Sequence, residues 1–211
     1  MKRVSFIDLG SNSVRFVIIE INENGSYQLI YQQKESIRLS ENMWEKNKLT
    51  EEAMERAIMT LKAFAHMAEA MDSLEIYAVA TAAVRLAKNG NELLTLVKER
   101  TGIDLECIDG TEEAYLGFLG VVNTIGLRDF ILFDLGGASI EVTLVKDRAV
   151  KHSVSLPMGA LTLTGKFQSG DEMSEKERKN LISHIQDVLS KEKWLKDKQL
   201  PLVGIGGTVR N

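Results

Sequence analysis

The chain has 211 residues, a length that corresponds to one large domain or two small ones. Apolar residues make up 44% of the sequence and charged residues 27%, as is typical of a protein that folds around a hydrophobic core. The formal net charge of -4 argues against nonspecific binding to nucleic acid, which requires a basic surface. It leaves room for a local basic pocket that binds an anion.

Secretory and membrane-spanning segments are not expected. Asp8 interrupts the apolar N-terminal stretch, so no signal peptide is predicted, and no apolar run approaches the ~20 residues that span a bilayer. Cys107 is the only cysteine, and its apolar neighbours predict a core position rather than a nucleophile. The three scattered histidines, His66, His152 and His184, lack a zinc-ligand spacing and are interpreted as structural. We therefore expect a cytoplasmic protein.

The first half of the chain predicts strands followed by helices. Strands are expected at residues 4–9, 14–21, 27–33 and 35–39, joined by polar turns. Thr50 is the predicted N-cap of a long helix whose apolar residues, methionines included, follow the 3.6-residue period to residue 71. The elements expected next are a strand at 76–80, helices at 82–87 and 92–100, a strand at 105–108, and a helix at 112–123 with Tyr115, Phe118, Leu119 and Val122 facing inward.

A second series of strands begins after residue 129. Strands are expected at residues 130–134, 139–145, 149–155 and 202–205. Ser174 and Glu177 form a capping-box pattern at the start of a helix that is predicted to end near Trp194. Because strands resume after a helix, we predict two domains, at residues 1–127 and 128–211.

A short motif occurs twice, and its two copies begin at Asp8 and Asp134, which are 126 residues apart (134 − 8). The motif reads DLGSNS at residues 8–13 and DLGGAS at residues 134–139, and each copy lies between two predicted strands. This distance is too long for a solenoid repeat and indicates a duplicated subdomain. A single copy would be interpreted as an ordinary hairpin turn.

Two matching copies favour a phosphate-binding function. Glycine allows a tight turn, and small residues leave backbone N–H groups and hydroxyls available to phosphate oxygens. An aspartate beside a phosphate requires a cation between them, and two facing carboxylates would suit Mg²⁺ held through waters.

Four further motifs follow the first in a fixed order, together with the second copy of the DLG motif. The set is IDLGSNSVR at 7–15, ATAAVR at 80–85, GTEEA at 110–114, DLGGASIE at 134–141, PMGA at 157–160 and GIGGTVR at 204–210. Together they resemble the exopolyphosphatase/guanosine pentaphosphate phosphatase (Ppx/GppA) family of the actin-like ATPase superfamily. The resemblance implies an α/β fold of two lobes with ribonuclease H-like topology, each lobe with a β-hairpin phosphate loop. Family members continue past the last motif, so the second lobe is expected to be C-terminally incomplete.

The resemblance also implies a role for each matching residue. Glu113 would be the general base that activates a water, and Arg85 would hold the terminal phosphate. Mg²⁺ is the implied cofactor, organised by Asp8, Asp134 and Glu141. The implied phosphate-binding residues are Gly10, Ser11, Asn12, Ser13, Gly136, Gly137, Ala138, Ser139, Gly206, Gly207 and Thr208. This division of labour suits phosphoanhydride hydrolysis, which needs charge neutralisation and an oriented in-line water.

The implied activity is removal of terminal phosphate from linear polyphosphate, and 5′-phosphate removal from guanosine pentaphosphate is the alternative that the same motifs allow. A sugar or acetate kinase of the same fold and a non-catalytic phosphate- or nucleotide-binding fragment are further alternatives. Taken alone, Glu112 and Glu113 would be interpreted as charges that complement a helix N-terminus. Family members often form homodimers, so the resemblance allows a homodimer here. The net charge and the lack of a long apolar run predict no nucleic-acid or membrane partner.

The sequence departs from the family pattern at three positions near the motifs. Ala138 stands where the family usually has a third glycine, and Ile140 stands where it often has threonine. Leu86 follows the motif arginine, where an acidic residue is common. These departures bear on rate and substrate preference more than on the fold.

Overall fold

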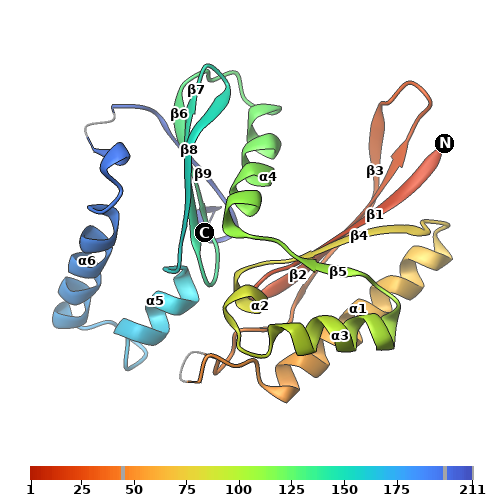
Figure 1. Cartoon of the computed structure of the whole chain (residues 1–211), viewed down its shortest axis with the longest axis horizontal. Coiled ribbons are helices and arrows are strands. Elements are labelled where there is room, and N and C mark those ends of the chain that lie inside the picture. The colour runs from red at the N-terminus through yellow and green to blue at the C-terminus, as the bar shows by residue number, and fades with distance from the viewer. Residues whose placement is uncertain (44–45, 197–198, 211) are drawn as a thin grey trace. The chain divides into compact units, whose positions relative to one another are not determined.

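The computed structural model describes residues 1–43, 46–196 and 199–210. The chain forms two compact units, Met1–Asp109 and Gly110–Asn211, and each unit has its own sheet (Figure 1). Mixed sheets with packed helices confirm the predicted α/β class. The units divide before the helix α4 (Gly110–Val122), whereas the sequence placed the division after Leu127. The difference arises because α4 packs on the second sheet.

The sheet of the first unit has the strand order β3-β2-β1-β4-β5. The strands β1 and β2 form an antiparallel hairpin that continues antiparallel into β3, while β4 lies parallel to β1 and β5 lies parallel to β4. Their bounds are β1 (Lys2–Leu9), β2 (Ser13–Ile21), β3 (Tyr27–Ser36), β4 (Glu75–Ala80) and β5 (Leu105–Cys107).

Helices of the first unit cover one face of this sheet. They are α1 (Glu51–Ala70), α2 (Ala82–Leu86) and α3 (Gly90–Thr101), and Figure 1 shows α1 and α3 beneath the strands. The Thr50 hydroxyl accepts a hydrogen bond from the Ala53 N–H (3.2 Å), which confirms the predicted N-cap. Met54 is buried in the core, as the helical period predicted, and Cys107 is half-buried at its edge. On the opposite face, the exposed rings of Phe6 and Tyr77 stack with centroids 5.7 Å apart.

The sheet of the second unit has the order β8-β7-β6-β9, with β9 parallel to β6 and the other pairs antiparallel. Its strands are β6 (Phe130–Leu135), β7 (Ile140–Lys146), β8 (Ala149–Leu156) and β9 (Leu202–Ile205). The remaining helices are α5 (Ala160–Phe167), α6 (Glu175–Leu189) and the 3-10 turns η1 (Lys193–Leu195) and η2 (Thr208–Arg210). Figure 1 shows α4 and α6 on opposite sides of the strands. In the described ranges, no helix combines the length and hydrophobicity that crossing a membrane requires.

The predicted duplication is visible in the backbone of both units. In each, three antiparallel strands are followed by a strand that returns parallel to the first. Both meanders also carry a β-bulge, between Ile18 and Ile19 in one unit and between Leu144 and Val145 in the other. The two bulges are again 126 residues apart (144 − 18), so the repeat seen in the motifs extends along the strands.

Four local predictions were wrong. No separate strand forms at 35–39, because β3 runs to Ser36 and the chain then leaves the sheet. The α6 helix ends at Leu189 instead of near Trp194. Tyr115 is exposed, whereas Phe118 and Val122 on the same helix are buried as expected. The helix α5 was not predicted, since Thr162, Thr164 and Gly165 give its sequence low helix propensity.

The start of α6 confirms the predicted capping box and leads to a prediction about pH. The Glu177 carboxylate accepts hydrogen bonds from the N–H and hydroxyl groups of both Ser174 and Ser169, which lowers its pKa from 4.5 to about 2. A lowered folded-state pKa stabilises the helix above pH 4.5, and this stabilisation is lost as the pH falls toward 2. We expect the protection factors of the amides in the first turn of α6, which correct for the intrinsic pH dependence of exchange, to decrease as the pH falls from 4.5 toward 2. Glu177→Gln should show low protection factors at both ends of this range, and pH-independent protection factors in the wild type would contradict the assignment.

Candidate phosphate-binding site

The first DLG motif forms the connection between β1 and β2. Asp8 lies near the end of β1, and the Gly10 N–H closes the turn by donating to the Ser13 carbonyl (3.0 Å). Behind the turn, the Ser11 carbonyl accepts from the Ser40 N–H (2.9 Å). The Asn12 carbonyl accepts from the N–H groups of Ile37 (3.0 Å) and Arg38 (2.8 Å). Residues 37–40, which follow β3, therefore hold the carbonyl side of the loop.

The second DLG motif connects β6 to β7 in the same way. The Gly136 N–H donates to the Ser139 carbonyl (3.0 Å), as Gly10 does to Ser13. Residues 159–162, which follow β8 and begin α5, bind the loop carbonyls behind this turn. These contacts are Ala160 N–H to Gly136 (2.9 Å), Leu161 N–H to Gly137 (2.8 Å), Thr162 N–H to Gly137 (3.2 Å), and Gly159 N–H (3.0 Å) and Thr162 Oγ1 (3.0 Å) to Ala138.

These contacts determine where the loop amides point. In a trans peptide, the C=O of one residue and the N–H of the next point in opposite directions, and the described chain has no cis peptide. With their carbonyls held from behind, the first loop directs the N–H groups of Asn12 and Ser13 to the other side. The second loop directs those of Gly137, Ala138 and Ser139 in the same manner. Successive N–H groups on one side of a turn form a concavity that binds anions such as phosphate.

Ala138, which replaces the family's usual glycine, fits this arrangement. Its side chain is fully buried, and its carbonyl is one of those bound by the segment 159–162. The methyl group therefore packs into the unit instead of standing over the N–H groups. Ser11 and Ser139 are also buried, so these two hydroxyls lie within the loops and not at an open surface.

Carboxylates accompany both loops. Across the β6–β7 ladder, Asp134 lies opposite Glu141, and the equivalent pair across β1–β2 is Asp8 and Arg15. Glu141 is buried and its Oε1 accepts from the Ser155 hydroxyl at 2.7 Å. The Asp8 side chain is accessible to solvent, yet nearby protein partly desolvates it and raises its pKa, an effect that Arg15 opposes.

The pair Asp134 and Glu141 fits a magnesium ion better than the pair Asp8 and Arg15 does. Mg²⁺ in phosphate-transfer sites uses one or two carboxylates together with waters and substrate phosphates, and Asp134 and Glu141 are two neighbouring carboxylates of this kind. Asp8 instead has a guanidinium opposite it. Over the described part of the chain, no group of three or more His, Cys, Asp or Glu side chains could hold a metal by itself. A cation at Asp134 and Glu141 would take waters or substrate oxygens as its additional ligands.

The Gly-Gly-Thr motif lies beside this carboxylate pair. Gly206 follows β9 with φ +96°, and a Cβ at this position would stand 2.5 Å from Asp134 Oδ1. The chain thus reaches Asp134 closely only because residue 206 is glycine. Gly207 comes next, and Thr208 begins η2 at an exposed position.

The two predicted catalytic residues belong to different units. Arg85 is in the last turn of α2, half-buried, and its Nη1 donates to the Ile108 carbonyl (2.8 Å). Glu113 is in the first turn of α4 and half-buried, next to the exposed Glu112. The first unit thus brings together Asp8, Arg15 and residues 10–13. The second unit brings together Asp134, Glu141, Gly206 and residues 136–139.

Several residues that shape the loops were missed from sequence. They are Ser40, Arg56 and Thr162, together with the role of Gly159 behind the second loop. The PMGA motif, which contains Gly159, was the one signal that pointed to this segment.

The match with known proteins covers nearly the whole chain. The model of the Ppx/GppA phosphatase family matches residues 17–210. The chain belongs to this family. A bifunctional 3-dehydroquinate synthase/phosphatase of Fusobacterium nucleatum is 32% identical over 96% of this chain and 32% of its own length. Exopolyphosphatase 1 of Mycobacterium tuberculosis is 32% identical over 80% of this chain and 50% of its own length. The chain thus spans half or less of these two curated relatives.

Solved structures of the family share the fold. The crystal structure of an exopolyphosphatase from Cytophaga hutchinsonii superposes with a TM-score of 0.92 at 29% identity, covering 99% of this chain and 68% of that one. The Ppx/GppA enzyme of Aquifex aeolicus gives a TM-score of 0.78 at 32% identity, covering 99% of this chain and 69% of that one. These matches confirm the predicted family and its actin-like fold.

Proposed function

We propose that this chain hydrolyses phosphoanhydride bonds and releases the terminal phosphate of linear polyphosphate. The observation that carries the proposal is the pair of equivalent hairpin loops, each of which turns successive N–H groups away from the segment that holds its carbonyls. Each such loop suits the binding of a phosphate group. Membership of the Ppx/GppA family and similarity to named exopolyphosphatases support the same reaction.

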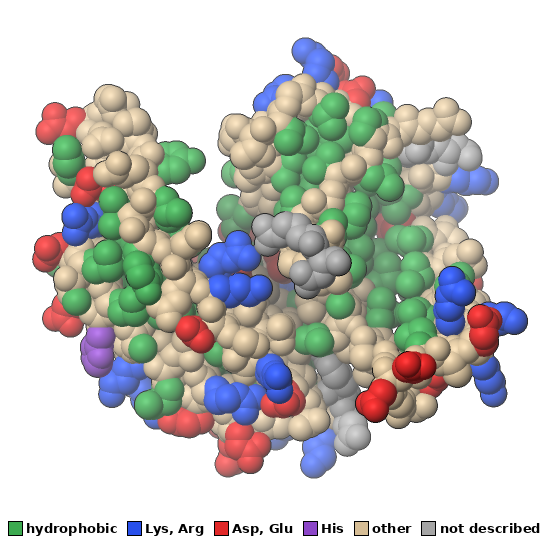
Figure 2. Space-filling model, turned by 180° about the vertical axis from the view of Figure 1, so that it is seen from behind, with side chains coloured by type: hydrophobic (Ala, Val, Ile, Leu, Met, Phe, Trp, Pro, Cys, Tyr) green, Lys and Arg blue, Asp and Glu red, His purple; other side chains and the backbone are tan. Residues whose placement is uncertain are grey.

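Directed contacts from individual residues explain phosphate binding better than an overall positive charge on the surface does. The net charge is -4, and in Figure 2 acidic and basic side chains are interspersed along the lower edge of the face shown. We infer that phosphate is bound by directed contacts, from the loop amides and from Arg85. Arginine suits this role because its planar guanidinium makes paired hydrogen bonds to phosphate oxygens.

The reaction needs a water placed in line with the bond that breaks. We assign Glu113 as the general base that takes a proton from this water, and Arg85 as the group that holds the terminal phosphate. Asp134 and Glu141 would hold Mg²⁺ together with waters and substrate oxygens. The ion would neutralise charge on the phosphate oxygens. The lone cysteine is compatible with a reducing compartment, and we place the activity in the cytoplasm.

The test is release of orthophosphate from short polyphosphate and, in parallel, from guanosine pentaphosphate. We expect turnover of polyphosphate that requires Mg²⁺ and stops with EDTA. Turnover of guanosine pentaphosphate alone would move the assignment to the 5′-phosphohydrolase alternative. Phosphate transfer from ATP to a sugar or acetate would support a kinase. Binding without turnover would leave a phosphate-binding protein.

A further inference from the structure

The carbonyls of both loops are bound from behind by a segment that follows the third strand of the unit. In each unit the chain leaves the third strand of the meander and turns back to bind the loop carbonyls, through residues 37–40 after β3 and residues 159–162 after β8. We call these two segments the braces. They differ in conformation, because the second begins a helix and the first does not, yet they meet equivalent atoms of the duplicated hairpin.

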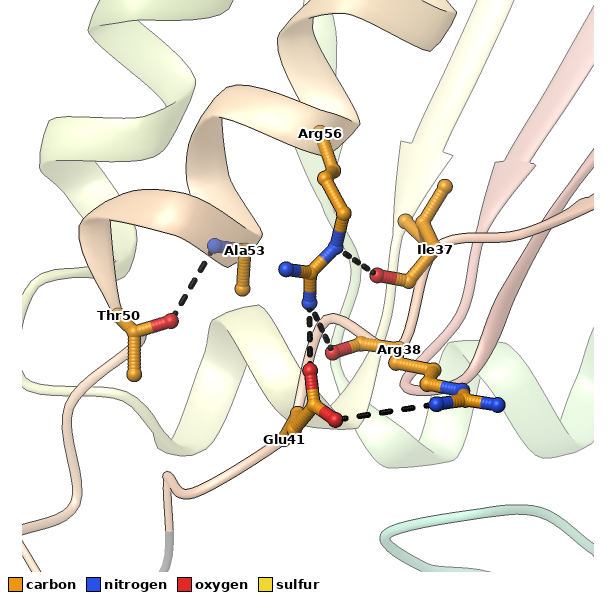
Figure 3. A network of polar contacts seen from close by, with 6 residues as sticks. All are labelled: Ile37, Arg38, Glu41, Thr50, Ala53 and Arg56. Atoms are coloured by element: carbon orange, nitrogen blue, oxygen red, sulfur yellow. Dashed lines mark hydrogen bonds and ion pairs between the residues drawn. The ribbon is translucent and has the colours of Figure 1, made fainter.

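The first brace is itself fastened to α1 by one side chain. Arg56 Nε donates to the Ile37 carbonyl (3.0 Å), and Arg56 Nη2 donates to Glu41 Oε2 (2.9 Å) and to the Arg38 carbonyl (3.4 Å) (Figure 3). Arg38 has a positive φ of 48°, which a non-glycine residue adopts at a cost. Such a conformation persists where the surroundings enforce it, and the Arg56 contacts on both sides of Arg38 supply that constraint.

The second brace is fastened by a hydroxyl. Thr162 Oγ1 donates to the Ala138 carbonyl (3.0 Å), the same oxygen that accepts from the Gly159 N–H. The Thr162 N–H also contacts the Gly137 carbonyl, so this residue touches two consecutive loop peptides. These are the peptides whose opposite ends carry the N–H groups of Ala138 and Ser139.

We propose that Arg56 and Thr162 are positioning residues that set phosphate affinity through the braces. This inference rests on the proposed phosphate-binding function of the loops. Neither residue lies in the loops. Thr162 binds the loop carbonyls directly. Arg56 holds the first brace, whose N–H groups bind the Asn12 carbonyl of the loop. An orientation that is fixed before binding saves the ordering cost at the moment of binding, so loosening either brace weakens phosphate binding.

The second brace is tested with Thr162→Val, which removes the hydroxyl and keeps the shape. One lost hydrogen bond corresponds to about a threefold to tenfold weaker dissociation constant. The probe is inorganic tripolyphosphate with Mg²⁺, titrated calorimetrically, and the KM for orthophosphate release should rise by the same factor with little change in kcat. Thr162→Ser should restore wild-type affinity. Thr164→Val, at an exposed site on the same helix, is the matched control and should bind like the wild type.

The first brace is tested with Arg56→Met, which removes all three contacts. We expect a loss of affinity of at least the same size, with partial recovery in Arg56→Lys. Arg100→Met is the matched control, because it breaks a comparable exposed ion pair to α1, between Arg100 of α3 and Glu55 of α1 (2.6 Å), away from the brace. If Arg56→Met does not fold, Arg56→Lys and the Thr162 variants still decide the question.

The outcomes separate this inference from the proposed function. Affinity of Thr162→Val and Arg56→Met within twofold of the wild type would overturn it, even if their melting temperatures fall. Thr162→Ser behaving like Thr162→Val would also overturn it. A wild type that binds tripolyphosphate without hydrolysing it would refute the proposed hydrolase activity. The role of the braces would still be tested by comparing the dissociation constants of the variants with that of the wild type. A wild type that binds no tripolyphosphate would refute both.

Discussion

Glu113→Gln is expected to abolish most hydrolysis while leaving substrate binding nearly intact. General base catalysis by a positioned side chain contributes about 100-fold to 10,000-fold, so we expect kcat for orthophosphate release to fall by this range. The KM should change little, because the amide keeps the size of the carboxylate and the loop amides are untouched. Tripolyphosphate binding by the variant, measured alongside turnover, separates loss of the base from loss of the site.

The neighbouring Glu112 provides a control for the electrostatics of the helix. Both glutamates occupy the first turn of α4, where a negative charge stabilises the helix by about 0.3–1 kcal/mol. Glu112→Gln removes the same formal charge from an exposed side chain and should retain wild-type kcat. A Glu113→Gln variant within threefold of the wild type would remove Glu113 as the base. An equal loss in both variants would show that the charge matters for the helix and not for the chemistry.

The hairpins were predictable because the residues that determine them lie close together in the sequence. The DLG motifs place glycine where the turn closes, and the flanking strands show the apolar runs expected of buried strands. The same holds for the cap at Thr50 and the capping box at Ser174, where one side chain and one nearby N–H decide the structure. At these positions, sequence and structure agree.

The parts that were missed depend on contacts distant in sequence. β3 ends at Ser36 because Ile37 and Arg38 bind the carbonyl of Asn12, which belongs to another turn. The helix α5 begins where it does because its first N–H groups find acceptors in residues 136–138, not because its own sequence favours a helix. Backbone-to-backbone contacts of this kind leave no side-chain pattern. The family motif around Gly159 marked the place without revealing its partner.

The catalytic and metal-binding roles are harder to predict from the sequence than the fold is. Glu141 reads as one more polar residue on an alternating strand, and only the register opposite Asp134 makes it half of a carboxylate pair. Arg15 occupies the equivalent position in the first hairpin, so the duplication conserves the geometry and reverses the charge. The two loops are therefore alike in the backbone geometry that we propose for phosphate binding, and unlike in the charges that could hold a cation.

Gly159→Ala is expected to have the largest effect on the second loop. A Cβ at residue 159 would stand 2.4 Å from the carbonyl carbon of Gly137 and 2.5 Å from the backbone N and C of Ala138. All three atoms are backbone, so no side chain can rotate away, and the loop must separate from the start of α5. We expect destabilisation of the second unit by about 1–3 kcal/mol and a loss of tripolyphosphate affinity of more than tenfold.

The position of the amides that lose protection distinguishes the expected local effect from general unfolding. Amide exchange should accelerate at Ala160 and Leu161, whose N–H groups bind the loop, while α1 and the rest of the first unit keep their protection. Gly170→Ala is the matched control, because a Cβ there meets nothing within 4 Å, and it should change neither exchange nor affinity. Because Gly159 touches the loop only through backbone atoms, its replacement alters phosphate binding solely by moving peptides. A Gly159→Ala variant with wild-type affinity would mean that the orientation of these N–H groups does not determine binding.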